Sequence, residues 1–363
     1  MLTVLHTESS EGWGGQEIRV VAESLGMMKR GYMVLLAASE RGKIFGRARE
    51  AGIGVFPVHF DKKNPLCIKK TLSIINGERV DIVNTHSSSD SWVAGIAARL
   101  SSSRPGVIRT RHLSTPIRRS YLSRLLYNVL PDAVITTGEE IRQRMINDNG
   151  FDAAKIFSIP TGVDTERFNP SRARPAFRVG GFTAGMVGVL RSWKGHRYFI
   201  EAVPGISWRI PGALFYIVGD GPQRENIKKM IGDLSLGDRV IMAGHREDIP
   251  EVMASLDVVV QPSYASEGVP QSILQAMAMG KPVVASDTGA IKEVVVDGVS
   301  GFLVEPRNPG MLAEKVIELY ENPGLRMEFG KNGRRLVEER YSFDDMLDKV
   351  ESLYGKILSR RPV

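Results

Sequence analysis

The chain has little sulfur chemistry, because Cys67 is its only cysteine among 363 residues. One thiol excludes an intrachain disulfide and any metal site built from several cysteines. Long apolar runs are missing too, since no stretch approaches the ~20 apolar residues that cross a bilayer. The N-terminus has a short apolar stretch without the basic segment that precedes a secretory leader. These absences predict a cytoplasmic protein without structural disulfides.

The rest of the composition is that of an ordinary globular chain, with 42% hydrophobic and 25% charged residues. Its length suits two domains. Residues 1–171 hold 23 basic and 17 acidic side chains, a net charge of +6, whereas residues 172–363 hold 25 and 24. The basic first half predicts an anionic partner there, such as membrane headgroups, a phosphorylated lipid or nucleic acid. A basic surface that is merely solvated is the alternative.

Short apolar runs alternate with amphipathic segments almost throughout, which predicts parallel sheets covered by helices on both faces. Helices are expected, for example, over 16–29 and 91–100. The predicted strands of the first half are 3–6, 33–38, 55–59, 81–86, 107–112, 133–137 and 156–160. Those of the second half are 183–189, 214–219, 240–243, 258–261, 283–286 and 301–304.

A break between two domains is visible at residues 169–181, which carry two prolines, two glycines, three arginines and no apolar period. That composition is typical of a linker. We therefore predict an N-terminal domain over residues 1–170 and a C-terminal domain over residues 171–341. An amphipathic helix is expected in the tail, residues 342–363.

The most distinctive stretch is 257–286, which predicts a buried strand, a loop with Glu267, a helix from about Pro270, and a second buried strand. Ligands of open α/β sheets bind where strand ends meet such helix N-termini. Gly268 permits close backbone approach, and Pro270 suits the first helical turn. We expect the N–H groups of Gly268 and Val269 to bind a diphosphate. A simple helix-start acid is the alternative for Glu267.

A second candidate phosphate site lies upstream, where Arg191 and Lys194 follow a predicted strand and Gly195 opens a helix. Either cation alone would more often be a solvated surface charge. Gly219 and Gly244 follow the next two strands, where a glycine is typical of a turn. A glycine pair at that point is only a weak sign of phosphate binding.

A glycine-rich loop follows the first predicted strand and contains Gly14 and Gly15. It precedes a helix whose apolar face is predicted to be Ile18, Val21 and Leu25. Adjacent glycines permit positive φ and close backbone approach. The spacing is not that of a dinucleotide site, and the acid such a site needs after the second strand is absent.

His86 and His112 end two predicted strands, so both imidazoles are expected at the carboxyl edge of the first sheet. A structural role is the alternative for each of them. No cluster of histidine, aspartate and glutamate has the spacing of a metal site, and we predict none.

Residues 118–130 interleave Arg118, Arg119 and Arg124 with tyrosine and leucine. This pattern predicts a basic amphipathic helix of the kind that rests on an anionic membrane surface. A helix packed into the core with a solvated basic face is the alternative.

These motifs together resemble the retaining GT-B enzymes of glycosyltransferase family 4. Residues 257–286 resemble the donor-site signature of that family, and Lys194-Gly195 and the Gly14-Gly15 loop match its pattern. Residues 159–170 are similar to its Pro-Asn-Gly-Val-Asp segment. The resemblance spans nearly the whole chain. It departs at Gln275, where the family has a second glutamate, and at Arg191, which is shifted from the family's Gly-Arg-Leu.

The resemblance implies two Rossmann-like domains facing each other across a cleft. The N-terminal domain would bind the acceptor, the C-terminal domain the nucleotide-sugar, and the C-terminal helix would cross back onto the N-terminal domain. It further implies catalytic roles for Glu267, at the donor sugar, and for His112, which would position that sugar. Donor-binding residues would be Gly14, Gly15, Arg191, Lys194, Gly219, Gly244, Gly268, Val269, Pro270 and Gln275, and acceptor-side residues His86, Arg118 and Arg119.

The implied activity is transfer of a hexose-type sugar, with retention, from a UDP- or GDP-sugar to a glycolipid, lipopolysaccharide or polysaccharide. The enzyme would need no cofactor or metal and would sit on the inner face of the membrane, with no nucleic acid partner. Two rivals stay open. One is a GT-B epimerase or phosphorylase, although the cofactor-lysine motif of a phosphorylase is absent. The other is a non-catalytic sugar-nucleotide or nucleic-acid binder, which Gln275 in place of glutamate leaves open.

Overall fold

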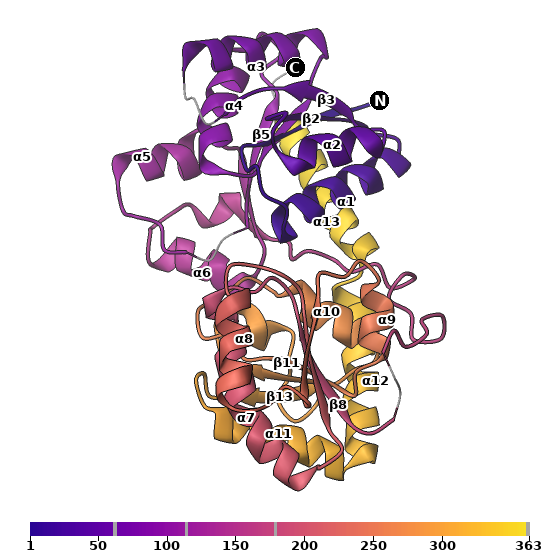
Figure 1. Ribbon diagram of the computed structural model, residues 1–363. Helices are drawn as coiled ribbons and strands as arrows, with labels where there is room; N and C mark the ends of the chain where they lie inside the picture. Colours follow the sequence, from indigo (N-terminus) through magenta and orange to yellow (C-terminus); the bar gives the residue numbers. More distant parts are fainter. Residues whose placement is uncertain (61–63, 113–114, 178–179, 361–363) are drawn as a thin grey trace. The chain divides into compact units, whose positions relative to one another are not determined.

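The computed structural model describes residues 1–60, 64–112, 115–177 and 180–360. The chain forms two compact units (Figure 1): the first unit is Met1–Pro160 with Met346–Val363, and the second is Thr161–Asp345. Residues 178–179 of the predicted linker lie outside the described part. Residues after Pro160 belong to the second unit because Val163 pairs with Ser342 and Gly162 packs directly on the Ser342 backbone.

The first unit is built on a seven-stranded parallel sheet with the order β3-β2-β1-β4-β5-β6-β7. Every strand predicted for this half is present, with ends that shift by one or two residues. The strands are β1 (Thr3–Glu8), β2 (Met33–Ala38), β3 (Gly54–Pro57), β4 (Ile82–Thr85), β5 (Gly106–Arg111), β6 (Ala133–Thr136) and β7 (Ile156–Ser158).

Helices cover both faces of this sheet because neighbouring strand residues point to opposite sides. In β2, Leu35 packs with α3 (Pro65–Gly77) and α4 (Ser88–Leu100), whereas Leu36 packs with α2 (Lys43–Glu50). The helices are α1 (Gly15–Lys29), α2 (Lys43–Glu50), α3 (Pro65–Gly77), α4 (Ser88–Leu100), α5 (Tyr121–Arg124), the π-helix η1 (Leu125–Val129), α6 (Glu139–Asn147) and the 3₁₀ turn η2 (Ala153–Lys155).

The last helix, α13 (Phe343–Leu358), lies beside α1 in the first unit from Met346 onward (Figure 1). Arg30, just after α1, pairs with Asp348 at 2.6 Å and with Glu351 at 3.0 Å. The face of α13 that holds Val350 and Tyr354 is fully buried. The amphipathic pattern of the tail therefore reflects a helix packed against the first unit.

The second unit has a six-stranded parallel sheet with the order β10-β9-β8-β11-β12-β13. The predicted strands are again all present. They are β8 (Thr183–Val187), β9 (Leu214–Val218), β10 (Val240–Gly244), β11 (Val258–Gln261), β12 (Val283–Ser286) and β13 (Gly301–Val304).

Two hydrophobic layers sandwich this sheet, and β11 shows how its residues alternate between them. Val258 and Val260 pack toward α7 (His196–Arg209) and α11 (Pro309–Glu321), whereas Val259 packs toward α9 (Ile249–Ala254) and α10 (Gln271–Ala278). The helices and 3₁₀ turns are η3 (Ser192–Lys194), α7 (His196–Arg209), α8 (Arg224–Asp233), α9 (Ile249–Ala254), α10 (Gln271–Ala278), η4 (Gly289–Glu293), α11 (Pro309–Glu321) and α12 (Pro323–Arg340).

Each sheet reverses its strand order at one point, between β1 and β4 in the first unit and between β8 and β11 in the second. At such a switch point the connections leave in opposite directions, so the strand ends open a crevice for ligands. The loops after β1, β4, β8 and β11 are therefore the parts of each unit most suited to hold a site.

Two predictions about helices were wrong in detail. The buried face of α1 holds Arg19 and Glu23, and Ile18, predicted to be on its apolar face, is 50% exposed. The segment 118–130 is not one helix: Ser120 caps a short α5, which continues as a π-helix. Arg118 and Arg119 lie before that cap because the Ser120 hydroxyl accepts the N–H of Ser123.

Within the described residues, no helix combines the length and the apolar character that crossing a membrane requires.

Candidate active site

The loops after β8 and β11 bring Lys194 and Glu267 together in the second unit. The Lys194 ammonium pairs with Oε2 of Glu267, and the hydroxyl of Ser263 donates to Oε1 of the same carboxylate. The side chains of Lys194 and Glu267 are 20% and 13% exposed. A carboxylate and a cation thus meet at the switch point of the sheet, in partial contact with solvent.

Gly195 allows this corner to close. Its φ of 78° is left-handed, and a Cβ at this position would lie 1.8 Å from the carbonyl oxygen of Pro262. No side chain fits that approach, so only a glycine at this position lets the loop after β8 come this close to the loop after β11. Gly195, which precedes the first residue of α7, thus lets Lys194 lie close to Glu267.

A chain of hydrogen bonds from buried and partly buried side chains holds the Glu267 carboxylate. Ser263, which is fully buried, accepts from the side-chain amide of Gln261 at 2.8 Å. The carbonyl oxygen of the same Gln261 side chain accepts from the hydroxyl of Ser272 at 3.0 Å. The carboxylate is therefore held in one orientation by residues at the end of β11 and the start of α10.

The turn between Glu267 and α10 offers free backbone donors. Among the described residues, the N–H groups of Gly268 and Val269 have no hydrogen-bond acceptor, although Val269 is 8% exposed. Pro270 is the N-cap of α10 with extended φ and ψ, not part of its first turn as predicted. A proline with ψ of 127° cannot be helical, so the helix begins one residue later.

Gln275 lies on α10, one turn after Gln271, and is partly exposed. Its side chain makes no hydrogen bond within the described residues. The amide group can both donate and accept, so this position offers polar groups to a ligand without adding charge.

The remaining predicted donor residues lie at or after the carboxyl ends of β8, β9 and β10. Arg191 precedes η3, is exposed, and lies 5.1 Å from the ring of Trp193. The N–H of Gly219 donates to the carbonyl of Gly244 at 2.8 Å, which joins the ends of β9 and β10. Both glycines have positive φ.

His196 is a candidate that the sequence reasoning missed. It is the first residue of α7, only 4% exposed, and follows directly on Lys194-Gly195. Burial, and secondly the charge of Lys194, lower the pKa of its imidazole to about 4. The imidazole of His196 is therefore neutral at neutral pH and adds no charge next to Lys194. Its place directly after the Lys-Gly pair was the available signal.

In the first unit, His86 and His112 are brought together and joined by a third imidazole, His6, which was not predicted. Nδ1 of His6 lies 2.8 Å from Nε2 of His86, and Nδ1 of His86 lies 3.0 Å from Nε2 of His112. We call these three residues the imidazole row. They come from β1 and from the ends of β4 and β5, at the switch point of the first sheet.

Burial lowers the pKa of all three imidazoles, so the row is neutral at neutral pH. Their nitrogens bond one another along a line instead of converging. Within the described residues, no group of three histidine, cysteine, aspartate or glutamate side chains could hold a metal ion.

Two buried carboxyl groups lie next to the row, and neither was predicted. Asp90, at the start of α4, accepts from the backbone N–H groups of His86 and Ser87 and from the hydroxyl of Thr7. Burial, and secondly the charge of Glu8, raise its pKa to about 8.

Glu8 ties this group to the glycine loop, because it accepts from the Gln16 amide at 2.5 Å and from the Ser87 hydroxyl at 2.7 Å. Gly14 caps α1 through its N–H, which donates to Glu17 at 2.8 Å, and Gly15 faces open space. The loop is thus anchored to the carboxyl end of β1.

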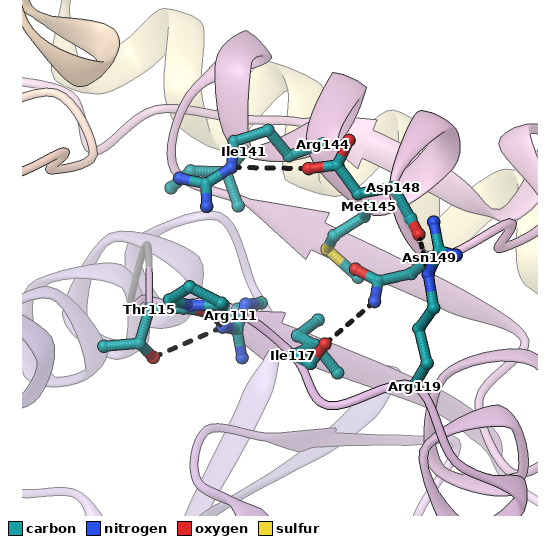
Figure 2. Close-up of a pocket in the computed structure, with 10 residues that line it drawn as sticks. Arg111, Thr115, Ile117, Arg119, Ile141, Arg144, Met145, Asp148 and Asn149 are labelled. Atoms are coloured by element: carbon teal, nitrogen blue, oxygen red, sulfur yellow. Dashed lines mark hydrogen bonds and ion pairs between the residues drawn. The ribbon is translucent and has the colours of Figure 1, made fainter.

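A basic pocket of about 130 Å³ lies farther along the same unit (Figure 2). Three arginines line it, Arg111, Arg119 and Arg144, together with the single acid Asp148. Figure 2 shows how they are held: Arg144 pairs with the Asp148 carboxylate, and Arg119 donates to the Asp148 carbonyl. Arg118, predicted beside Arg119, is exposed and does not line this pocket.

Comparisons with known proteins add to this geometry. Residues 13–167 match the family model described as Glycosyltransferase Family 4, and residues 168–336 match the model described as Glycosyl transferases group 1. A UDP-Gal:alpha-D-GlcNAc-diphosphoundecaprenol alpha-1,3-galactosyltransferase of Escherichia coli is 30% identical over 301 residues, which are 77% of this chain and 76% of that protein.

Solved structures share the fold. A glycosyltransferase from Rickettsia africae superposes with a TM-score of 0.90 at 23% identity, over 99% of both chains. The Anabaena protein HepE, solved in complex with UDP-glucose, gives a TM-score of 0.84 at 22% identity, over 98% of this chain and all of that one. Two Rossmann-like parallel-sheet domains in this arrangement of elements constitute the GT-B fold.

Proposed function

The chain belongs to glycosyltransferase family 4, and we propose that it transfers a hexose-type sugar, with retention, from a UDP- or GDP-sugar to a glycolipid or cell-surface polysaccharide. The observation on which the proposal chiefly depends is the Lys194–Glu267 corner of the second unit. It combines a cation, a carboxylate and free backbone N–H groups at the switch point of the sheet. A sugar diphosphate presents the complementary groups, which are phosphate oxygens and hydroxyls.

In this proposal, the corner stabilises charge as the bond between the sugar and the diphosphate breaks. Lys194, Arg191 and the N–H groups of Gly268 and Val269 neutralise the leaving diphosphate. Glu267 binds the donor sugar and stabilises the positive charge that develops at its anomeric carbon. Charged groups that are held in place before the reaction contribute most to such a step.

The acceptor hydroxyl forms the new glycosidic bond on the face that the diphosphate leaves, and its proton passes to the departing phosphate. His112 of the first unit positions the sugar. This scheme uses no protein nucleophile and no metal, so the roles of the side chains are binding, orientation and charge stabilisation.

UDP is the favoured nucleotide of the donor. The E. coli relative uses UDP-galactose by its name, and HepE binds UDP-glucose. A thermal-shift series with UDP-, GDP-, ADP- and CDP-sugars tests this, since a ligand at 100 times its Kd stabilises the folded state by about 2.7 kcal/mol. We expect the largest shift with a UDP-sugar. No shift with any of the four would contradict the proposed donor class.

A phosphate-bearing lipid is the favoured acceptor, and the first unit supports this choice. Arg111, Arg119 and Arg144 line its basic pocket. Nearby, Tyr121 and Leu122 of α5 are 75% and 62% exposed, an arrangement that suits contact with a membrane surface. The name of the E. coli relative also describes a lipid diphosphate acceptor. We propose that the enzyme works on the inner face of the membrane as a peripheral protein.

Vesicle binding tests the membrane part of this proposal. The triple variant Arg118→Glu, Arg119→Glu, Arg124→Glu should lose sedimentation with anionic vesicles, because each basic residue at the surface contributes ~1 kcal/mol. Transfer to a lipid acceptor should fall more than transfer to its water-soluble head group. Wild-type sedimentation of the variant, or equal losses on both acceptors, would rule out this surface.

The two rival functions are separated by one assay of the wild-type chain with and without acceptor. A glycosyltransferase needs the acceptor to consume the donor sugar. An epimerase converts the donor without any acceptor, and a binding protein shifts its melting temperature but leaves donor and acceptor unchanged.

A further inference from the structure

His6 takes no part in the proposed reaction, yet it is fully buried and ends the imidazole row. Its ring is nearly parallel to that of His86, with an angle of 12° between the planes. Within the described residues, its outer nitrogen, Nε2, has no hydrogen-bond partner. At the other end of the row, His112 is partly exposed. The row therefore connects a closed interior end with an open end.

A row of three neutral imidazoles has two self-consistent arrangements of its hydrogens, since each ring then holds one N–H donor and one bare acceptor. In the first, every ring carries its hydrogen on Nδ1, and each N–H points along the row toward His112. In the second, every ring carries it on Nε2, and each N–H points toward His6. In the first arrangement, Nδ1 of His112 is a hydrogen-bond donor, and in the second it is an acceptor.

The closed end decides between them. In the second arrangement, the N–H at Nε2 of His6 would be a buried donor without an acceptor, a group that folded proteins almost always avoid. An unsatisfied buried donor loses its full hydrogen bond to water. The first arrangement leaves only a bare acceptor there. All internal donors are satisfied, and the hydrogen that is left over lies on Nδ1 of His112.

We propose that His6 and His86 are positioning residues that set the tautomer of His112, so that its Nδ1 presents a hydrogen-bond donor at the open end of the row. This inference rests on the proposed function, because His112 acts on the sugar there. A donor in a fixed place holds a sugar oxygen in one orientation. The bond that one ring nitrogen makes determines which nitrogen is protonated.

Burial keeps the row neutral, and the charged groups that face it have smaller effects. Arg19 and Glu23 of α1 pair with each other at 3.4 Å; Glu23 raises and Arg19 lowers the pKa of His6, and Arg19 also lowers the pKa values of His86 and His112. Asp90 of α4 bonds the backbone of His86, and Tyr354 of α13 lies beside Glu23 and Arg19. Since burial lowers each pKa, no ring becomes an imidazolium that would repel a positively charged sugar in the transition state.

Nitrogen NMR of the full chain, with ¹⁵N in its histidines, tests the arrangement directly. Protonated and bare ring nitrogens have well-separated shifts. We expect His6, His86 and His112 to be neutral Nδ1–H tautomers from pH 6 to 8, although free histidine favours the Nε2–H form. Nε2–H tautomers in the row, or an imidazolium at pH 7, would overturn the inference without any variant having to fold.

Two substitutions of His86 supply the kinetic test. Asparagine places an amide N–H near the position of Nδ1 and can still donate to His112, whereas leucine cannot. We expect His86→Leu to lower kcat ~10-fold or more, with KM for the donor changed less than ~2-fold, and His86→Asn to retain most of kcat. In the leucine variant, His112 should show a mixture of tautomers. His59→Gln, at an exposed histidine outside the row, is the matched control.

Equal kcat in the leucine and asparagine variants would overturn the inference, because the row would then only fill space. His112→Ala separates this failure from failure of the proposed function. If His112→Ala lowers kcat but the two His86 variants behave alike, His112 acts without the row. If His112→Ala transfers sugar at the wild-type rate, the role of His112 in the proposed function is wrong.

Discussion

The two units hold polar sites at the same topological position, but the sites differ in charge. In the second unit, the switch point carries an ion pair, Lys194 with Glu267, in partial contact with solvent. In the first unit, it carries the imidazole row and two buried carboxyl groups whose pKa values are raised. The groups that we propose to face a diphosphate are thus charged and near solvent, whereas the imidazole row is neutral and largely buried.

In the proposed reaction, this difference divides the roles of the two sites. Lys194, on the loop that Gly195 holds, stabilises the leaving diphosphate by its charge. The neutral imidazoles orient the sugar through hydrogen bonds in that reaction, and they carry no net charge that would repel a cationic sugar. Substitutions at the charged corner and acidification of the row test that division.

Glu267→Ala should lower kcat/KM by ~10² or more, because it removes the carboxylate that stabilises positive charge in the transition state. The melting temperature should change little, since Glu267 lies on a loop and not in the core. Asp238→Ala, which removes an exposed acid from a loop of the same unit, is the control and should be fully active. If Glu267→Ala turns over like the wild type, the Lys194–Glu267 corner is not the donor site.

Lys194→Ala should weaken binding of free UDP by about 1.5–3 kcal/mol, the worth of a charge-assisted hydrogen bond. Arg191→Ala should have a smaller effect, because Arg191 is exposed and already stacks against Trp193. Calorimetric titration of each variant with UDP measures both. If both affinities equal that of the wild type, the diphosphate binds elsewhere.

Gly195→Ala should destabilise the second unit by about 2 kcal/mol, since alanine is strained at positive φ and its Cβ would meet the Pro262 carbonyl. UDP affinity should fall with it, because Lys194 moves away from Glu267. Gly232→Ala is the matched control: that glycine lies in α8 with open space around it, so alanine should stabilise the helix. Thermal unfolding of both variants distinguishes a role of the corner from general sensitivity to alanine.

Acid should destabilise the first unit more than the second. The pKa of a buried imidazole is lower in the folded than in the unfolded chain, so its contribution to stability is lost as pH falls below ~6.5. The first unit holds three such rings, and the second holds His196. Asp90 and Glu8 act in the opposite direction, because their raised pKa values favour the folded state at lower pH.

With these contributions combined, we expect a loss of roughly 1–3 kcal/mol between pH 7 and pH 5.5. Urea unfolding at both pH values measures it. The loss should shrink in His6→Asn and stay unchanged in His245→Asn, whose histidine is exposed. An equal change in His6→Asn and the wild type would mean that His6 does not have a lowered pKa in the folded chain.

The sequence alone predicted the strands and the charged corner because both have local causes. Apolar runs such as 258–260 specify buried parallel strands, and the end of this run lies within one residue of the end of β11. Glu267 and Lys194 each follow a strand directly, so their place at the carboxyl edge could be inferred from position alone. Pro270 shows the limit, since its place before the helix depends on backbone angles that the motif does not fix.

The imidazole row could not be predicted in full, because it depends on which strands are neighbours. His6 and His86 are 80 positions apart and meet only because β1 pairs with β4. The face of α1 was misassigned for a related reason. Arg19 can be buried because its guanidinium donates a hydrogen bond to the carbonyl oxygen of Ile159 at 2.8 Å. Helix periodicity does not reveal such a partner. Polar groups buried by long-range pairing look like surface groups in the sequence.

Hydrogen–deuterium exchange of the full chain, with and without a UDP-hexose, tests the central claim most directly. If the donor binds at the corner, peptides covering residues 188–196 and 264–276 should gain protection, because the donor would satisfy the free N–H groups of Gly268 and Val269. The same peptides should show no protection in Lys194→Ala at the same donor concentration. Protection that leaves both segments unchanged, and appears elsewhere, would contradict the assignment of the donor site to the Lys194–Glu267 corner.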